Sequence, residues 1–176
     1  MTAHPGGWTM IQRRQDGSID FFRNWTCYKN GFGNLSGEFW FGLDKIHRLT
    51  KSGQKFLRIA MSDNKSVRTV VNYTSFFVSN EDEQYKLSIS GYSGSVQDAM
   101  KYSNGEKFHT RDKDNKHHCP QKKKGGWWYR NCAATNPNGP YKKNLNGLYW
   151  ESWKKDRKTY IYPKTFQMVL RPSEEP

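Results

Sequence analysis

Three cysteines are the residues of this 176-residue chain with the clearest capacity for covalent chemistry: Cys27, Cys119 and Cys132. In a secreted protein an odd number predicts one disulfide bridge and one leftover thiol. His117 and His118 directly precede Cys119, which raises the question of a zinc site. Adjacent histidines rarely face one metal, and a cysteine in a disulfide cannot be a ligand, so we expect no zinc. With five histidines and no nucleophile motif, the chain offers no catalytic arrangement, and we predict that it is not an enzyme.

Four Asn-X-Ser/Thr sequons are candidate glycosylation sites and favour an extracellular protein. They begin at Asn24, Asn34, Asn64 and Asn72. No apolar run approaches the ~18–20 residues of a membrane-spanning helix, so we expect no membrane insertion. The polar start, Met1 to Pro5, is not a signal peptide, and we expect it to be the edge of a fragment.

Positive charge dominates the surface chemistry, because 29 Lys and Arg against 16 Asp and Glu give a net charge of +13. This excess favours acidic partners, among them sulfated or sialylated glycans. The second half of the chain carries many of these charges: Arg111, Lys113, Lys116, Lys122, Lys123, Lys124, Lys142, Lys143, Lys154, Lys155, Arg157 and Lys158. A basic binding rim and a merely solvated surface both fit this pattern. The chain contains no nucleic-acid-binding motif, and we expect no such partner.

The elements that must position these residues are clearest in the first half of the chain. Apolar alternation and β-favouring residues predict strands over 8–13, 56–61, 66–77, 85–90 and 165–170. Helices are expected over 21–28, with Asp20 as the N-cap, and over 43–50. Residues 101–159 show little periodicity and predict a lobe built from loops. Aromatic residues, among them Trp127 and Trp128, should supply much of the core.

Several stretches resemble the C-terminal globular domain of the fibrinogen family. They are Gly6-Gly-Trp-Thr-Met-Ile-Gln-Arg-Arg-Gln-Asp-Gly17, Asn24-Trp25, Tyr28-Lys-Asn-Gly-Phe-Gly-Asn-Leu-Ser-Gly-Glu-Phe-Trp40, Ile46-His-Arg-Leu49, Tyr85-Lys-Leu-Ser-Ile-Ser-Gly-Tyr-Ser-Gly94 and Gly126-Trp-Trp-Tyr-Arg-Asn-Cys132. The likeness implies a single secreted α+β domain over residues 6–171. A central twisted antiparallel sheet with short helices (about 6–100 and 160–171) is followed by a loop-rich, disulfide-stapled binding lobe (about 101–159), and the last strand returns to the sheet.

The resemblance also implies a disulfide between Cys119 and Cys132. In many family members the peptide bond before the second cysteine is cis, here Asn131–Cys132. Cys27 stands where the family ordinarily has another residue. We expect a buried thiol there, with a bridge to another chain as the alternative. The family's usual N-terminal segment is missing, so an oligomer would form through that absent region.

Asp112 and Asp114 are similar to the family's calcium loop. Calcium needs six to eight oxygen ligands. Lys116 falls at a usual acidic position, and the stretch to Cys119 is shorter than the family's. A solvated acidic pair is therefore favoured, and calcium stays the doubtful alternative.

Lectins of the family hold acetyl groups in a pocket after the second cysteine, built from a histidine and tyrosines. Ala133 takes the place of that histidine. The predicted ligand-binding residues are Lys122, Lys123, Tyr129, Asn131, Cys132, Ala133 and Tyr141.

The leading hypothesis is a lectin-like extracellular recognition module for anionic or acetylated glycans on cells, microbes or matrix. The alternative is a growth-factor-like or matrix ligand that binds a protein receptor through the same lobe. A third reading is a domain that has kept its fold and lost its ligand sites.

Overall fold

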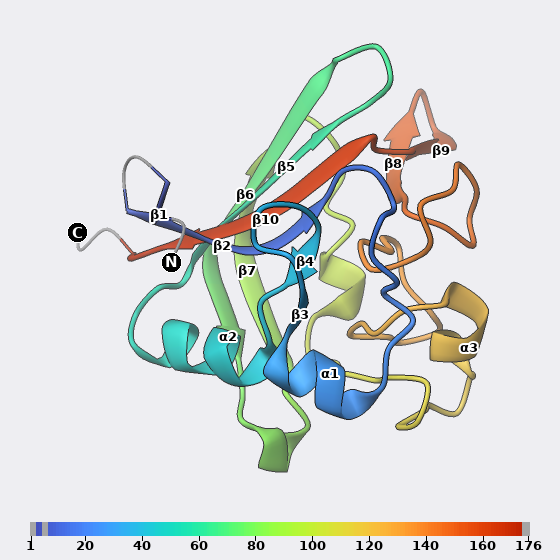
Figure 1. Cartoon of the computed structure of the whole chain (residues 1–176). Coiled ribbons are helices and arrows are strands. Elements are labelled where there is room, and N and C mark those ends of the chain that lie inside the picture. Colours follow the sequence, from blue (N-terminus) through green and yellow to red (C-terminus); the bar gives the residue numbers. More distant parts are fainter. Residues whose placement is uncertain (1–2, 5–6, 174–176) are drawn as a thin grey trace.

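One large antiparallel sheet forms the centre of the structure, a computed structural model that describes residues 3–4 and 7–173. The strands run in the order β3-β4-β2-β10-β5-β6-β7, with β1 paired to β2 (Figure 1). Their bounds are Ala3–His4 for β1, Trp8–Arg14 for β2, Phe32–Gly33 for β3, Phe39–Trp40 for β4, Phe56–Ser62 for β5, Arg68–Val78 for β6, Leu87–Gly94 for β7 and Thr165–Arg171 for β10. Gly6, where the predicted domain begins, lies outside the described residues. The predicted α+β class is confirmed.

The last strand, β10, lies in the middle of the sheet between β2 and β5. Phe166 pairs with Arg14 on one side and with Met61 on the other. Alternate residues of β5 and β10 are buried, as expected when one face of a sheet covers the core. The predicted return of the last strand to the sheet is confirmed.

Helix α1 begins later than the sequence predicts. Instead of starting after Asp20, it spans Trp25–Asn30. Asn24 is its N-cap, because the side-chain Oδ1 accepts the backbone N–H of Cys27 at 3.0 Å. Asp20 accepts the N–H of Phe22 instead, which fixes a turn before the helix.

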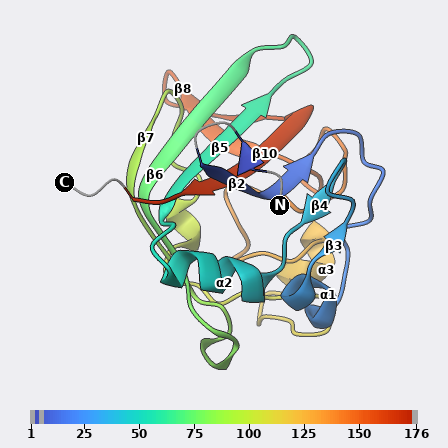
Figure 2. The same ribbon diagram turned by 60° about the vertical axis from the view of Figure 1, so that its left-hand side comes forward.

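Helix α2, Leu43–Lys51, packs against β6 and confirms the second predicted helix. Figure 2 shows it running across the sheet beside α1. Leu43 and Ile46 turn toward the core and are fully buried. Two short 3₁₀ helices, η1 (Glu81–Glu83) and η2 (Lys101–Ser103), follow later in the chain. Within the described residues, no helix is long and apolar enough to cross a membrane.

The loop-rich lobe contains more regular structure than the sequence predicts. Helix α3 spans Cys119–Lys123, and strands β8 (Trp150–Lys154) and β9 (Arg157–Ile161) form a separate two-stranded sheet. The hairpin turns at Lys155 and Asp156, which have φ of 48° and 60°. Two-residue hairpin turns with positive φ favour Asn and Gly, so this pair gives no turn signal in the sequence.

Side chains of the sheet hold this lobe through bonds to its backbone. The buried Gln12 donates from Nε2 to the carbonyl of Pro137 at 3.1 Å, and Arg14 donates from Nη1 to that of Gly139 at 2.6 Å. These hydrogen bonds give partners to backbone carbonyls of a buried loop, which has no neighbouring strand to pair with. They depend on residues 125 positions apart, which no local pattern reveals.

The aromatic core continues from the sheet into the lobe. Trp127 and Trp128 are fully buried, as predicted, and their rings lie 4.9 Å apart in an edge-to-face arrangement. Trp128 donates from Nε1 to the carbonyl of Tyr85 at 2.7 Å. One aromatic cluster therefore supports both parts of the molecule.

Candidate ligand-binding cleft beside the disulfide

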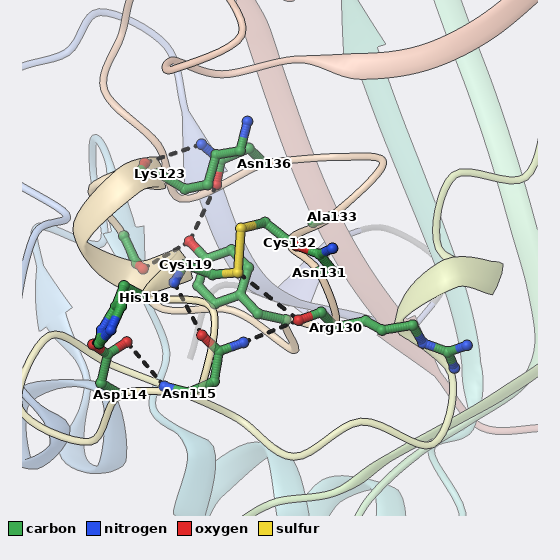
Figure 3. Close-up of a disulfide and its surroundings, with 12 residues drawn as sticks. Asp114, Asn115, His118, Cys119, Lys123, Arg130, Asn131, Cys132, Ala133 and Asn136 are labelled. Carbon is green, nitrogen blue, oxygen red and sulfur yellow. Dashed lines mark hydrogen bonds and ion pairs between the residues drawn. A yellow bond between two sulfur atoms is a disulfide. The ribbon is translucent and has the colours of Figure 1, made fainter.

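The disulfide between Cys119 and Cys132 closes the segment that carries the predicted site, and it confirms the implied pairing. The two Cα atoms lie 5.3 Å apart. Asn115 ties the same two ends together without covalent bonds (Figure 3). Its Oδ1 accepts the N–H of Cys119, and its Nδ2 donates to the carbonyl of Arg130, both at 3.0 Å. The backbone before Cys132 is therefore held from two directions.

Two expectations about this segment and about the third cysteine are wrong. The peptide bond between Asn131 and Cys132 is trans, the form that a non-proline bond favours by about 3–4 kcal/mol. Cys27 is a free thiol that is only half-buried, because it lies on the side of α1 that is not fully covered by the core.

A cleft of about 580 Å³ opens next to the disulfide. It draws on three parts of the chain: the η2 region, the residues around Cys132, and the β8–β9 hairpin. The lining residues are Asp98, Lys101, Tyr102, Arg130, Asn131, Ala133, Ala134, Glu151 and Lys158.

Arg130 is fixed at the edge of this cleft. Its Nε lies 2.7 Å from a carboxylate oxygen of Glu106, and its Nη2 donates to the carbonyl of Asn104 at 3.2 Å. The guanidinium lies over the ring of Tyr102, 5.3 Å from the centroid, and the side chain extends away from the disulfide in Figure 3. Tyr102 in turn donates to the carbonyl of Asn131 at 3.1 Å.

The other charged residues of the cleft differ in how far they are already engaged. Asp98 already accepts the hydroxyl of Tyr73 at 2.6 Å and the N–H of Lys101 at 3.0 Å. Burial, with Asp98 nearby, raises the pKa of Tyr73, so its hydroxyl stays a donor. Glu151 pairs with Lys158 at 3.4 Å. Among the described residues Lys101 has no carboxylate within ion-pair distance, and its charge is available to a ligand.

The floor of the cleft is apolar and well held. Ala133 and Ala134 are half-buried and pack against the core. The hydroxyl of Tyr149 donates to the carbonyl of Ala133 at 2.6 Å, and the N–H of Glu151 donates to that of Ala134 at 2.8 Å. Two methyl groups in the same cleft as the cation of Lys101 can receive a ligand that has both an apolar part and a negative charge.

The predicted ligand-binding residues fall into separate places. Asn131 and Ala133 line the cleft, with Cys132 between them. Tyr129 is 1% exposed and donates its hydroxyl to the carbonyl of Gly125, so its assignment to a ligand site is corrected: it is a core residue.

Lys122, Lys123 and Tyr141 do not line this cleft. Lys122 is an exposed residue of α3, and Lys123 donates to the carbonyl of Leu145 at 2.6 Å and lies over the ring of Tyr149. Tyr141 borders a different cleft.

Sequence reasoning overlooked several lining residues, among them Asp98, Lys101, Tyr102 and Glu151. Among the other lining residues, Arg130 belongs to the recognised motif before Cys132, and Lys158 is one of the basic residues named from the sequence.

Asp112 and Asp114 do not fit a calcium site in this arrangement. Oδ1 of Asp112 accepts both the N–H of Trp25 and the hydroxyl of Thr110, each at 2.8 Å. Oδ2 of Asp114 lies 2.7 Å from Nδ1 of His118. Both carboxylates thus serve local donors. In the part of the chain that the structure describes, no group of three or more acidic, histidine or cysteine residues could hold a metal.

The four sequon asparagines differ in their surroundings. Asn34 and Asn64 are exposed in loops. Asn24 uses its side chain to cap α1, and Asn72, on β6, accepts from Nε of Arg58 at 2.9 Å. Oδ1 of Asn34 also accepts a hydrogen bond, from the N–H of Ser36 at 2.9 Å, so it is their greater exposure that makes the two loop asparagines the more accessible sites for a glycan.

Sequence comparisons with known proteins agree with one another. A sequence model of the C-terminal globular domain of fibrinogen beta and gamma chains matches residues 1–173. Ryncolin-4 of Cerberus rynchops is 43% identical over 99% of this chain, and tenascin-R of Rattus norvegicus is 44% identical over 88%. The chain spans 52% of the length of the former and 12% of the latter.

Solved structures agree with the sequence comparison. The fibrinogen-like globe domain of human ANGPTL2 is 39% identical, with a TM-score of 0.88 over 97% of this chain and 82% of that domain. Lamprey fibrin D-dimer, complexed with the peptide Gly-His-Arg-Pro-amide, is 29% identical, with a TM-score of 0.86 over 98% of this chain and 64% of its own.

Proposed function

The chain belongs to the family of fibrinogen C-terminal globular domains, and from this premise we propose that it is an extracellular recognition module rather than an enzyme. The family match and the disulfide support this, because structural disulfides persist in oxidising, extracellular surroundings. Its ligand is an anionic glycan, in particular a sugar with both an acetyl group and a carboxylate, bound in the cleft beside the disulfide.

The observation that carries this assignment is the charge arrangement of the cleft. Lys101 is free of a carboxylate partner among the described residues, while Asp98 is engaged by Tyr73 and backbone donors. A ligand carboxylate near Lys101 therefore gains a cation without displacing an existing ion pair. The methyl groups of Ala133 and Ala134 can contact an acetyl group.

Replacing Lys101 by glutamate is expected to weaken binding of N-acetylneuraminic acid about tenfold or more, because one attractive charge becomes repulsive. Titration calorimetry at low salt measures this. Lys107→Glu is the matched control, since Lys107 is exposed but does not line the cleft. Equal losses in both variants would mean that only net charge matters and would contradict a site at the cleft.

A protein or peptide ligand is the second candidate, and the peptide bound to lamprey fibrin D-dimer favours it. The two candidates respond differently to salt. Exposed charges are screened beyond ~8–10 Å at physiological salt, so glycan binding should weaken steeply as salt rises. Receptor binding through buried aromatic contacts should persist in high salt and should not be displaced by free sugar.

We propose further that the domain works without calcium at Asp112 and Asp114. Neither millimolar calcium nor a chelator is expected to change the unfolding midpoint, because both oxygens of Asp114 and one of Asp112 already accept local donors and Lys116 opposes a cation. Thermal unfolding with calcium, magnesium and chelator tests this. A ligand at 100 times its Kd stabilises by about 2.7 kcal/mol, so a saturable rise with calcium alone would overturn the proposal.

A further inference from the structure

A second cleft, of about 350 Å³, lies between the loop after β2 and the start of the loop over residues 140–149, called the 140s loop below. Its lining residues are Arg14, Gly17, Ser18, Ile19, Asp20, Phe21, Phe22, Lys124, Pro140 and Tyr141. None of them lines the cleft beside the disulfide. We propose that this second cleft binds a sugar that carries a carboxylate or a sulfate, independently of the first.

Arg14 is the central residue of this site. It lines the cleft although only 1% of its surface is exposed. Its Nη1 donates to the carbonyls of Pro137 and Gly139, and Nε lies 3.4 Å from Glu38. Among the described residues, Nη2 has no hydrogen-bond acceptor. This nitrogen is the donor that Arg14 retains for a ligand.

The charge of Arg14 is only partly balanced by its neighbour. Glu38 accepts four backbone N–H groups in addition to the long contact with Arg14, so its negative charge is shared among five donors. Burial lowers the pKa of Arg14, although Glu38 acts in the opposite direction. Because Arg14 is buried and its counter-ion is also engaged by other donors, a second anion beside the guanidinium would be bound favourably.

Lys124 places a further cation at the rim. It ends α3, and its Nζ lies 5.0 Å from the ring centroid of Phe22, which also contacts Arg111 at 5.6 Å. Asp20 is the one acidic residue of the lining, and its Oδ1 accepts the N–H of Phe22. Its other oxygen can accept a sugar hydroxyl.

The opposite wall is fixed by Tyr141. Its hydroxyl lies 3.1 Å from the carbonyl of Gln15 and 2.7 Å from that of Lys164, and its single proton is shared between these two acceptors, which ties Tyr141 to the residues that follow β2 and precede β10. Gly17 makes this approach feasible: its φ is +75°, and a Cβ there would lie 2.7 Å from Cβ of Tyr141. The cleft thus has a preformed shape before any ligand binds.

These features together define the ligand chemistry. An oxyanion between Nη2 of Arg14 and Nζ of Lys124 would receive two charged donors, and a pyranose ring could lie against Phe22 and Pro140. The shared chemistry is an oxyanion on a sugar; glucuronic acid supplies it as a carboxylate and N-acetylglucosamine 6-sulfate as a sulfate. Neutral glucose lacks it.

Chemical-shift mapping of the whole chain with these three sugars and with inorganic sulfate tests the proposal. We expect glucuronic acid or the sulfated sugar to shift amides of residues 14–22, 124 and 141, while glucose and inorganic sulfate give at least tenfold weaker effects. Shifts confined to residues 98–102 and 130–134, no shifts at all, or equal binding of inorganic sulfate, would overturn it.

Two exposed positions supply variants that keep Arg14 intact. Lys124→Gln and Ser18→Glu should each weaken binding about tenfold, whereas Lys122→Gln, at an exposed position of α3 that does not line this cleft, should not change it. Lys101→Glu should also leave it unchanged, which separates this site from the first cleft. If Lys122→Gln weakened binding as much as Lys124→Gln, the net surface charge alone would explain both losses of affinity. That result would overturn the proposal.

Discussion

Replacing Glu38 by glutamine is expected to lower the free energy of unfolding by about 3–5 kcal/mol, the cost of removing one partner of a buried ion pair. Glu38 is fully buried beside Arg14. Its Oε2 accepts the N–H groups of Gln15, Asp16 and Gly17, and its Oε1 accepts that of Ile19. The amide of glutamine would present donors to these donors and would leave the arginine without its counter-charge.

Chemical denaturation at neutral pH measures this loss, and Glu83→Gln is the control. Glu83 is exposed and should stay within about 0.5 kcal/mol of the parent protein. A loss below about 1 kcal/mol for Glu38→Gln would show that the loop after β2 holds its shape without the carboxylate.

The pH dependence of the same variant gives an independent check. Burial alone would raise the pKa of Glu38, but the backbone N–H donors and Arg14 outweigh it and lower the pKa below its ordinary value of 4.5. The unfolded carboxyl then takes up its proton at a higher pH than the folded one. The stabilisation is fully present above about pH 4.5 and is lost as the pH falls through the folded pKa. The gap between parent and variant should therefore narrow in acid.

The five longest strands, β2, β5, β6, β7 and β10, could be predicted because each carries a local sequence pattern, whereas the shorter strands were missed. Phe166, Met168 and Leu170 alternate with half-buried residues, and this period of two marks a strand before any partner is known. The helix after Asp20 could not be placed correctly for the opposite reason. Asp20 and Asn24 are both good caps, and only the tertiary contact of Phe21 with Arg14 and the core accounts for the non-helical segment before Trp25.

The structure of the loop-rich lobe could not be predicted from local sequence patterns, because hydrogen bonds between residues far apart in the sequence hold it in place. Gln12 and Arg14 hold carbonyls of residues 137–139, and Asn138 donates from its amide to Gly126. None of these contacts produces a periodic pattern. For the same reason only part of the cleft could be predicted. The resemblance led to Asn131 and Ala133, whereas Lys101 and Glu151 are brought to the cleft by the tertiary fold.

Removing the disulfide should have a comparable effect on stability and an additional effect on binding. Replacing both Cys119 and Cys132 by serine is expected to lower the free energy of unfolding by about 3 kcal/mol, since the bridge closes a loop across 13 positions. Cys27→Ser is the matched control: Cys27 is a free, half-buried thiol, and its loss should cost less than about 1 kcal/mol. Denaturation of the three proteins compares them directly.

The effect on the cleft separates a shaping role from a purely stabilising one. Arg130, Asn131 and Ala133 all lie within two residues of the bridged Cys132, so without the bridge their positions rest on non-covalent contacts alone. We expect the double serine variant to bind N-acetylneuraminic acid about tenfold more weakly at a temperature where it is still folded. If the folded variant binds with unchanged affinity, Asn115 and the packing of Ala133 are sufficient to form the cleft, and the disulfide contributes stability only.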